Sequence, residues 1–149
     1  MKKNKILISA CLGGIKCRYD NEIRTCSKMI QLTDKFICIP VCPEQLGGLP
    51  TPRTPSFISK GNGFDVLRGQ AKVVTLNGND VTENFLLGAQ QALKIAQLTG
   101  CTQAVLKEKS PSCGVKYIYD KDTLVKGCGV TTALLLDNGF SVRSEEDVD

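Results

Sequence analysis

Histidine is absent from the 149-residue sequence, and this absence removes much of the usual catalytic repertoire. Without histidine the chain contains no Ser-His-Asp or Cys-His pair, and no zinc site that is built on histidine ligands. The C-x2-C spacing, which is typical of structural zinc sites and of thiol redox enzymes, is absent as well. Thiolates and carboxylates are therefore the candidate ligands and catalytic groups.

Aromatic residues and long apolar runs are both scarce. Aromatic residues make up 5% of the chain, which leaves few side chains for stacking on single-stranded nucleic acid, and the formal net charge is only +4. The composition thus argues against nucleic-acid binding. No run approaches the roughly 18 apolar residues of a membrane span, and the apolar stretch after Lys5 is too short for a signal peptide. We therefore expect a cytoplasmic protein without membrane association, and the length predicts a single domain over residues 1–149.

Eight cysteines are present in this chain. In a secreted protein they would predict a disulfide framework, but in a cytoplasmic protein this density more often indicates metal or redox chemistry. Half of the cysteines are each explained as small buried apolar side chains, namely Cys26, Cys38, Cys101 and Cys128. The other four lie in short segments that are rich in glycine, proline or charged residues.

The order of apolar runs and helical patterns predicts the fold class. Short continuous apolar runs typical of buried parallel strands cover residues 5–10 and 36–41, and residues 103–110 are predicted to form the next strand. Helical patterns cover residues 25–35, 81–100 and 130–139, and Thr82 and Gly100 are the expected N-cap and stop signal of the longest helix. Residues 64–80 have the pattern of a β-hairpin with an Asn-Gly turn. We therefore expect an α/β fold: a single three-layer Rossmann-like domain with a mainly parallel sheet and a small β-hairpin insertion.

Cysteines follow all three predicted parallel strands. Cys11 and Cys42 come directly after the first two strands, and Cys113 lies in the segment after the third. Ligands of open parallel sheets bind beyond the carboxyl ends of the strands, so these three thiols are expected to converge at one edge. Glycines in the same loops, such as those of "CLGG" and "SPSCG", allow a bulky group to approach the main chain. Spacing alone leaves an iron-sulfur cluster and a structural zinc ion both open.

Three linked motifs add a family resemblance. In order, and over most of the chain, "SACLGGIKCRYD", "PVCPEQLGGLPTPR" and "LKEKSPSCG" resemble the small bacterial family of thiouracil desulfidases. The sequence departs from the family at one position of the first motif. The family usually reads R-Y-D-G, whereas residues 18–21 of this chain read R-Y-D-N, so Asn21 replaces the glycine. Asparagine tolerates the left-handed turn conformation better than most residues, so the same fold is expected.

The resemblance implies a 4Fe-4S cluster held by Cys11, Cys42 and Cys113, with the fourth iron free of protein ligands. The implied activity is the non-redox removal of sulfur, as sulfide, from a small thio-heterocycle such as a thiolated nucleobase. An open iron is a Lewis acid that can bind the sulfur of a thiocarbonyl. Because histidine is absent, Glu44 is the candidate base for water or for a ring proton. By analogy with the family, Ser110 is expected beside the substrate.

Other interpretations stay open at this stage. Glu44 could instead cap its turn or pair with Arg53, and Ser110 could have only a turn or capping role. Cys17 could be a fourth ligand, a transient sulfur acceptor or a buried thiol that supports its loop. At the level of the whole protein, the alternative is a non-catalytic metal-binding protein whose zinc or cluster site is structural or senses redox state. A thiol redox enzyme is a third possibility, which the missing C-x-x-C disfavours.

Overall fold

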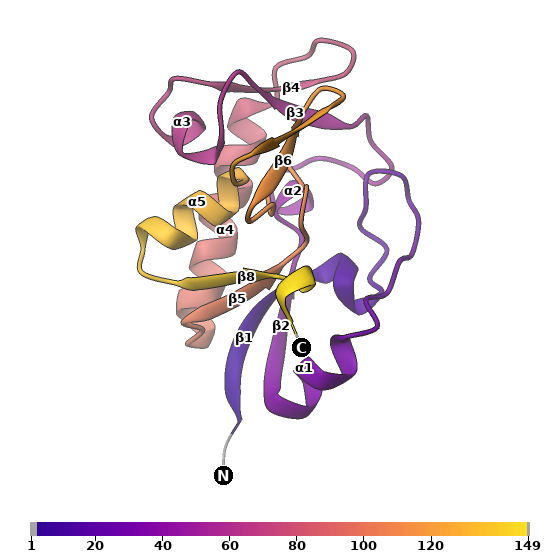
Figure 1. Cartoon of the computed structure of the whole chain (residues 1–149), viewed down its shortest axis with the longest axis vertical. Coiled ribbons are helices and arrows are strands. Elements are labelled where there is room, and N and C mark those ends of the chain that lie inside the picture. Colours follow the sequence, from indigo (N-terminus) through magenta and orange to yellow (C-terminus); the bar gives the residue numbers. More distant parts are fainter. Residues whose placement is uncertain (1–2, 149) are drawn as a thin grey trace.

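The computed structural model describes residues 3–148, and its centre is a parallel sheet of four strands (Figure 1). The strands are β1 (Asn4–Ser9), β2 (Phe36–Val41), β5 (Gln103–Leu106) and β8 (Ser141–Ser144), in the spatial order β2-β1-β5-β8. β1 pairs with β2 over six residues, from Asn4 opposite Phe36 to Ser9 opposite Val41. The mainly parallel sheet that the sequence predicts is therefore confirmed, and β2 has the predicted bounds.

Helices cover both faces of this sheet, which gives the expected three layers. Alternate side chains of β1 point to opposite faces, as the pleat of a strand requires. Leu7 packs in one core with residues of α4 (Thr82–Thr99) and α5 (Val130–Asp137). Ile6 and Ile8 pack in a second core with Leu32 of α1 (Met29–Lys35). Short 3-10 turns follow β1 and β8, as η1 (Ala10–Gly13) and η2 (Glu145–Asp147).

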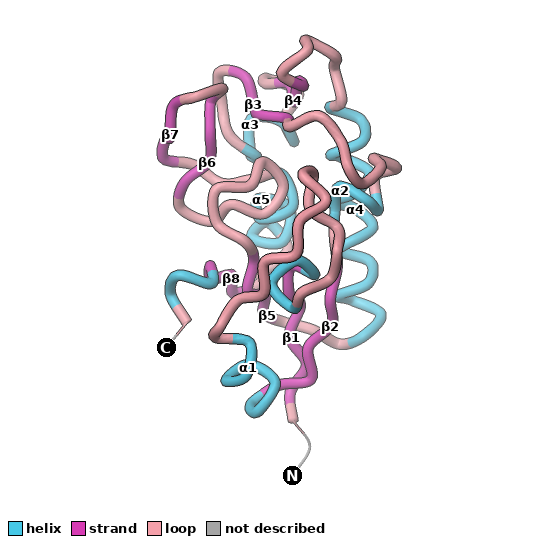
Figure 2. Tube along the Cα trace, turned by 90° about the vertical axis from the view of Figure 1, so that its right-hand side faces the viewer, coloured by secondary structure: helices cyan, strands magenta, loops and turns pink. Residues whose placement is uncertain are grey.

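Two antiparallel hairpins and two short helices lie beyond the carboxyl ends of the central strands. One hairpin joins β3 (Ser56–Ser59) to β4 (Lys72–Thr75), and the other joins β6 (Tyr117–Asp120) to β7 (Thr123–Lys126). The short helices are α2 (Pro43–Leu46) and α3 (Gly63–Leu67). A further core fills this part of the molecule, where Phe85 of α4 packs with Ile58, Val73 and Ile118. Figure 2 shows the connecting loops gathered between the central sheet and the hairpins.

The predicted hairpin over residues 64–80 is wrong in its first half. Residues 64–67 belong to α3, because Asn62 and Asp65 form a capping box: the Asn62 side chain accepts from the Phe64 and Asp65 amides, and Asp65 accepts from the Asn62 amide. β4 therefore pairs with β3, and α3 lies in the connection between these two strands. The Asn-Gly turn does occur, immediately after β4, with a hydrogen bond from the Gly78 amide to the Thr75 carbonyl.

The bounds of other elements also differ from the sequence prediction. Thr82 is the first residue of α4 and Val81 is its N-cap, because the Thr82 hydroxyl is used to accept a hydrogen bond from the Val73 amide of β4. Gly100 ends this helix in the left-handed conformation, as predicted. The hairpin of β6 and β7 was not predicted. No helix within residues 3–148 is long and apolar enough to cross a membrane.

Candidate functional site

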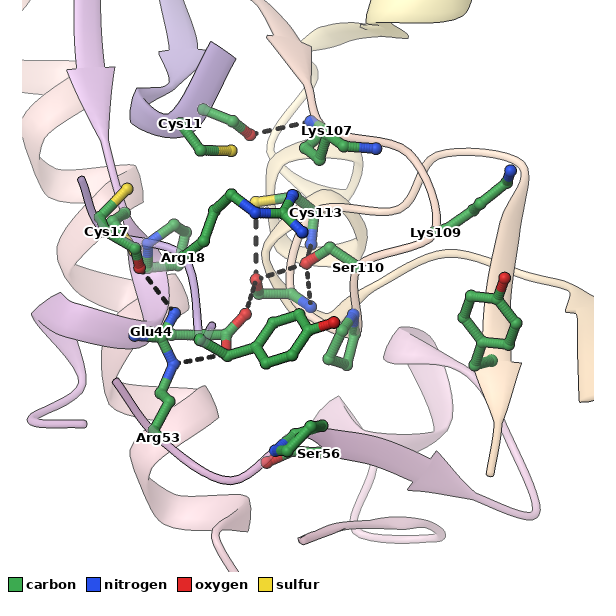
Figure 3. A pocket seen from close by; sticks show the side chains of 18 of the residues that line it. Cys11, Cys17, Arg18, Glu44, Arg53, Ser56, Lys107, Lys109, Ser110 and Cys113 are labelled. Carbon is green, nitrogen blue, oxygen red and sulfur yellow. Dashed lines mark hydrogen bonds and ion pairs between the residues drawn. The ribbon is translucent and has the colours of Figure 1, made fainter. Parts of the chain in front are cut away.

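The three cysteines that follow the parallel strands line one cavity of about 460 Å³. Cys11 lies in η1 directly after β1, Cys42 is the N-cap of α2 directly after β2, and Cys113 lies in the turn after β5. The expected convergence of these residues at one edge of the sheet is therefore confirmed. Figure 3 shows the Cys11 and Cys113 side chains directed into this space from opposite loops.

A fourth thiol, that of Cys17, joins two of these cysteines. It is buried beside Cys11 and Cys42, and the Cys42 thiol donates to the Cys17 carbonyl oxygen at 3.7 Å. Hydrogen bonding to Cys17 lowers the pKa of Cys11 and lowers the pKa of Cys42 to about 7. The same bonds raise the pKa of Cys17 itself, so the proton stays on Cys17. The site thus offers two sulfurs that are prepared to act as thiolates.

Cys113 lies deeper than the other thiols. Burial raises the pKa of the Cys113 thiol to about 12, which favours the protonated form when no metal is bound. Hydrogen bonding with Ser9 and Ser112 acts in the opposite direction. The Ser112 hydroxyl lies 3.5 Å from the Cys113 sulfur, but its single proton is also within reach of Glu44 at 3.1 Å, the shorter of the two contacts. Deprotonation of this sulfur therefore needs an additional positive charge, which a bound metal would supply.

Glu44 lies at the side of the same cavity, in the first turn of α2. One oxygen, Oε1, forms an ion pair of 3.1 Å with Nε of Arg53. The other oxygen, Oε2, accepts a hydrogen bond of 3.1 Å from the Ser112 hydroxyl, beside Cys113. The ion pair with Arg53 that the sequence left as an alternative is therefore present, and it occupies only one of the two carboxylate oxygens.

Arg53 fixes the carboxylate by binding several groups at once. Its guanidinium donates to the Cys17 carbonyl at 2.9 Å and to the Pro50 carbonyl at 3.0 Å, in addition to Glu44. Its backbone amide donates to the Tyr19 carbonyl at 2.8 Å. The planar fork of arginine suits this arrangement, which ties the loop of Cys17 to the turn that carries Glu44.

Ser110 is linked to Glu44 through Ser112. The two serine hydroxyl oxygens are 3.0 Å apart, and the Ser110 oxygen also accepts from the backbone amides of Ser112 and Cys113. A hydroxyl carries one proton, so a Ser112 hydroxyl that donates to Glu44 can accept the proton of Ser110. Ser110 therefore has the capping role that the sequence left open, and it also ends a chain of hydroxyl groups that leads to the carboxylate.

Arg18 and Tyr19 of the first motif line the cavity, and the residues after them form a turn. Arg18 binds Asp20 through two hydrogen bonds of 3.1 Å, as expected of a structural ion pair. Asn21 adopts the left-handed conformation with φ of 61°, as the comparison with glycine predicted. Within residues 3–148, no three Cys, Asp or Glu side chains converge on one point as the ligands of a single metal ion do. The four thiols instead surround a larger space.

Comparison with known proteins agrees with this geometry. A sequence profile of the 2-thiouracil desulfurase family matches residues 6–147. The chain belongs to this family. It is 44% identical over 146 residues to the uncharacterized protein YbbK of Bacillus subtilis (strain 168), with 96% of this chain and 97% of YbbK covered. The solved structure of the [4Fe-4S]-dependent thiouracil desulfidase TudS superposes with a TM-score of 0.84 at 38% identity, over 98% of this chain and 93% of TudS.

The other cysteines of this 2-thiouracil desulfurase family member lie in the packed cores or loops. Cys101 is buried with Leu7 and Ala96, and Cys26 and Cys38 pack beside α1. Cys128 is buried in the segment before α5, and burial raises its pKa to about 11. The predicted role of a small buried side chain is therefore confirmed for Cys101 and Cys128, whereas Cys26 and Cys38 are only partly buried.

Sequence analysis missed two contributors to this desulfurase site. Ser112 stands inside "SPSCG", and its contact with Glu44 depends on how two distant loops meet. Ser9 ends β1, and its hydroxyl accepts from the Lys107 amide at 2.9 Å while bonding to Cys113. Each residue is an ordinary serine in sequence, so only the folded arrangement distinguishes it.

Proposed function

We propose that this protein releases sulfide from a thiolated pyrimidine of the thiouracil type, without net oxidation or reduction. In this reaction a C–S bond is broken, a C–O bond forms from water, and the two protons of the water leave with the sulfide. Atoms and electrons balance without any other reactant. The observation that carries the proposal is the convergence of three cysteines and one carboxylate in a single cavity of a chain from the 2-thiouracil desulfurase family.

We further propose that Cys11, Cys42 and Cys113 hold a 4Fe-4S cluster, as the relative TudS depends on one. The donor set fits this group, because thiolates are its usual ligands and three of them come from separate loops around one space. When bound, a cluster with one iron free of protein ligands supplies a Lewis acid for the sulfur of a thiocarbonyl. Cys17 then supports the loop beside two of the ligands, and its carbonyl oxygen lies 3.7 Å from the Cys42 sulfur.

The protein's own groups manage the protons in this proposal. Glu44 takes a proton from the attacking water or from the heterocycle, and Arg53 and Ser112 hold its two oxygens in place. Ser110 bonds the substrate and connects to the carboxylate through Ser112. Glu44 needs no histidine partner, because this hydroxyl chain offers a path for the proton.

The whole chain, residues 1–149, is proposed to act as one domain on a small molecule in the cytoplasm. A reducing compartment suits the eight free cysteines.

Anaerobic reconstitution with iron and sulfide tests the proposed function. We expect broad visible absorption, about four irons per chain by the cluster stoichiometry, and steady sulfide release from 2-thiouracil or 4-thiouracil with no reductant added. A substrate series should include the free bases and their nucleosides, since both carry the reacting thiocarbonyl. A colourless protein with one zinc and no sulfide release would instead support the non-catalytic metal site.

A further inference from the structure

Glu108 is a buried carboxylate that the proposed mechanism does not use. It lies two residues after the end of β5 and five residues before Cys113, and only 2% of its surface is exposed. Buried glutamates are rare unless a partner compensates for the loss of water. Among the ion pairs of residues 3–148, none involves Glu108.

The compensation comes from the main chain. Oε1 of Glu108 accepts hydrogen bonds from three consecutive backbone amides, those of Val115 at 2.7 Å, Lys116 at 3.0 Å and Tyr117 at 3.2 Å. A fourth amide, that of Lys109, lies 3.3 Å away. One carboxylate oxygen thus binds both ends of the segment from residue 108 to residue 117 and closes it into a ring.

The first residues of α5 donate hydrogen bonds to carbonyl groups of the same segment. The Val130 amide donates to the Pro111 carbonyl at 2.9 Å, and the Thr131 amide donates to the Ser112 carbonyl at 2.8 Å. The Thr132 hydroxyl donates to the Cys113 carbonyl at 2.9 Å. Glu108 therefore binds backbone amides that follow Cys113 in the chain. The first residues of α5 bind the carbonyl group of Cys113 and the carbonyl groups of the two residues before it. The backbone of Cys113 is thus held from both sides.

We infer that Glu108 is a positioning residue: it fixes the loop that carries Ser110, Ser112 and Cys113, so that the Cys113 sulfur faces Cys11 and Cys42. Its Oε1 binds four amides of the main chain, at the side of the cavity that Glu108 itself lines. The expected effect of Glu108 on cluster binding rests on the function proposed above, whereas its expected effect on the order of the loop does not. Loss of Glu108 should loosen this loop before it unfolds the protein.

Thiol labelling of the iron-free full-length chain tests this inference directly. Cys113 is buried in the loop, and Cys101 is buried in the sheet core, so the ratio of their labelling rates compares local opening with global unfolding. We expect Glu108→Ala to raise the Cys113 to Cys101 ratio by about 10-fold to 100-fold, the range allowed by losing hydrogen bonds to a charged group. Glu108→Asp should raise it too, because its side chain is one methylene shorter. Glu108→Gln keeps an accepting oxygen and should fall between wild type and alanine.

Asp65→Ala is the matched control, because Asp65 also accepts a backbone amide, in the capping box of α3 away from the cavity. It should lower the melting temperature and leave the ratio unchanged. A ratio at the wild-type value in both the alanine and aspartate variants would overturn the inference, even if both melt earlier. If the alanine variant does not fold, the aspartate variant decides.

Reconstituted holoenzyme separates this inference from the proposed function. If wild type binds the cluster and releases sulfide, iron per chain should fall in the order wild type, glutamine, alanine. If wild type, Glu108→Gln and Glu108→Ala bind equal iron and show equal labelling ratios, the positioning role of Glu108 is contradicted and the proposed function is not. A wild-type protein that takes up no cluster would contradict the proposed function, whatever the labelling ratios.

Discussion

The Ser112 hydroxyl donates a hydrogen bond of 3.1 Å to Oε2 of Glu44, and this contact joins the loop after β5 to the helical turn after β2. The two residues are 68 positions apart in the chain. Glu44 is held at its other oxygen by Arg53, so the carboxylate has a fixed orientation toward the cavity. This relationship predicts how single substitutions should separate cluster binding from turnover.

Ser112→Ala should reduce turnover more than iron binding. The change removes the hydroxyl between Glu44 and Ser110 but leaves all three proposed ligands intact. We expect turnover to fall on the order of 10-fold or more, within the scale of a positioned proton-transfer group. Sulfide-release rate and iron per chain on one preparation measure this. Ser141→Ala, at an exposed position of β8, is the control and should change neither quantity.

Glu44→Gln should abolish most of the turnover while keeping the cluster. Glutamine has nearly the same size and can still bond to Ser112 and Arg53, but it lacks the basic oxygen. The expected loss is on the order of 10²-fold or more. Glu83→Gln, on the exposed first turn of α4, serves as control. Undiminished turnover with normal iron and normal melting would remove Glu44 from the mechanism, and collapse of the iron content would make it a support of the metal.

Gly129→Ala should destabilise the protein through a backbone clash. A Cβ at Gly129 would lie 2.6 Å from the Ser112 carbonyl oxygen and 2.7 Å from the Cys113 nitrogen, and neither atom can move without shifting the cysteine loop. We expect a loss of about 2 kcal/mol in the free energy of unfolding, as for other overpacked sites. Urea unfolding of the iron-free protein measures it. Gly13→Ala has only ordinary contacts of 3.8 Å and should cost far less; equal costs would contradict the proposed clash.

Replacement of the proposed ligands should remove iron selectively. Cys11→Ser, Cys42→Ser and Cys113→Ser each exchange a thiolate for a weak donor, so iron per chain should fall sharply. Cys101→Ser and Cys26→Ser, in positions away from the cavity, should keep nearly normal iron in whatever fraction remains folded. Equal loss in both sets would mean that the iron content reports stability and not coordination.

The sequence predicts the parallel sheet and the position of its cysteines well, for a physical reason. In β1, residues 6–9 are buried on both faces of the sheet and form a nearly continuous apolar run, whereas β2 has a similar apolar run but is a partly exposed edge strand. The carboxyl ends of these parallel strands meet at one edge. The placement of Cys11, Cys42 and Cys113 follows from that rule. Their roles as ligands stay predictions.

Contacts between distant segments were not predictable in the same way. The segment at residues 64–67 alternates like a strand, yet the side-chain capping of Asn62 and Asp65 makes it helical. Thr82 looks like an N-cap, but its hydroxyl binds β4. Glu108 looks like a surface charge in "KEKS", and only the return of residues 115–117 to the same place explains its burial. Cys17 likewise gains its contacts only when η1 and α2 meet.

The most direct test of the account is single-turnover sulfide release by the anaerobically reconstituted wild-type protein, with substrate, product and cluster followed together. The account predicts one sulfide for each thiouracil converted to uracil, incorporation of ¹⁸O from labelled water into the product, and no electron donor required. Conversion that stops unless a reductant is supplied, or a product without water-derived oxygen, would contradict it.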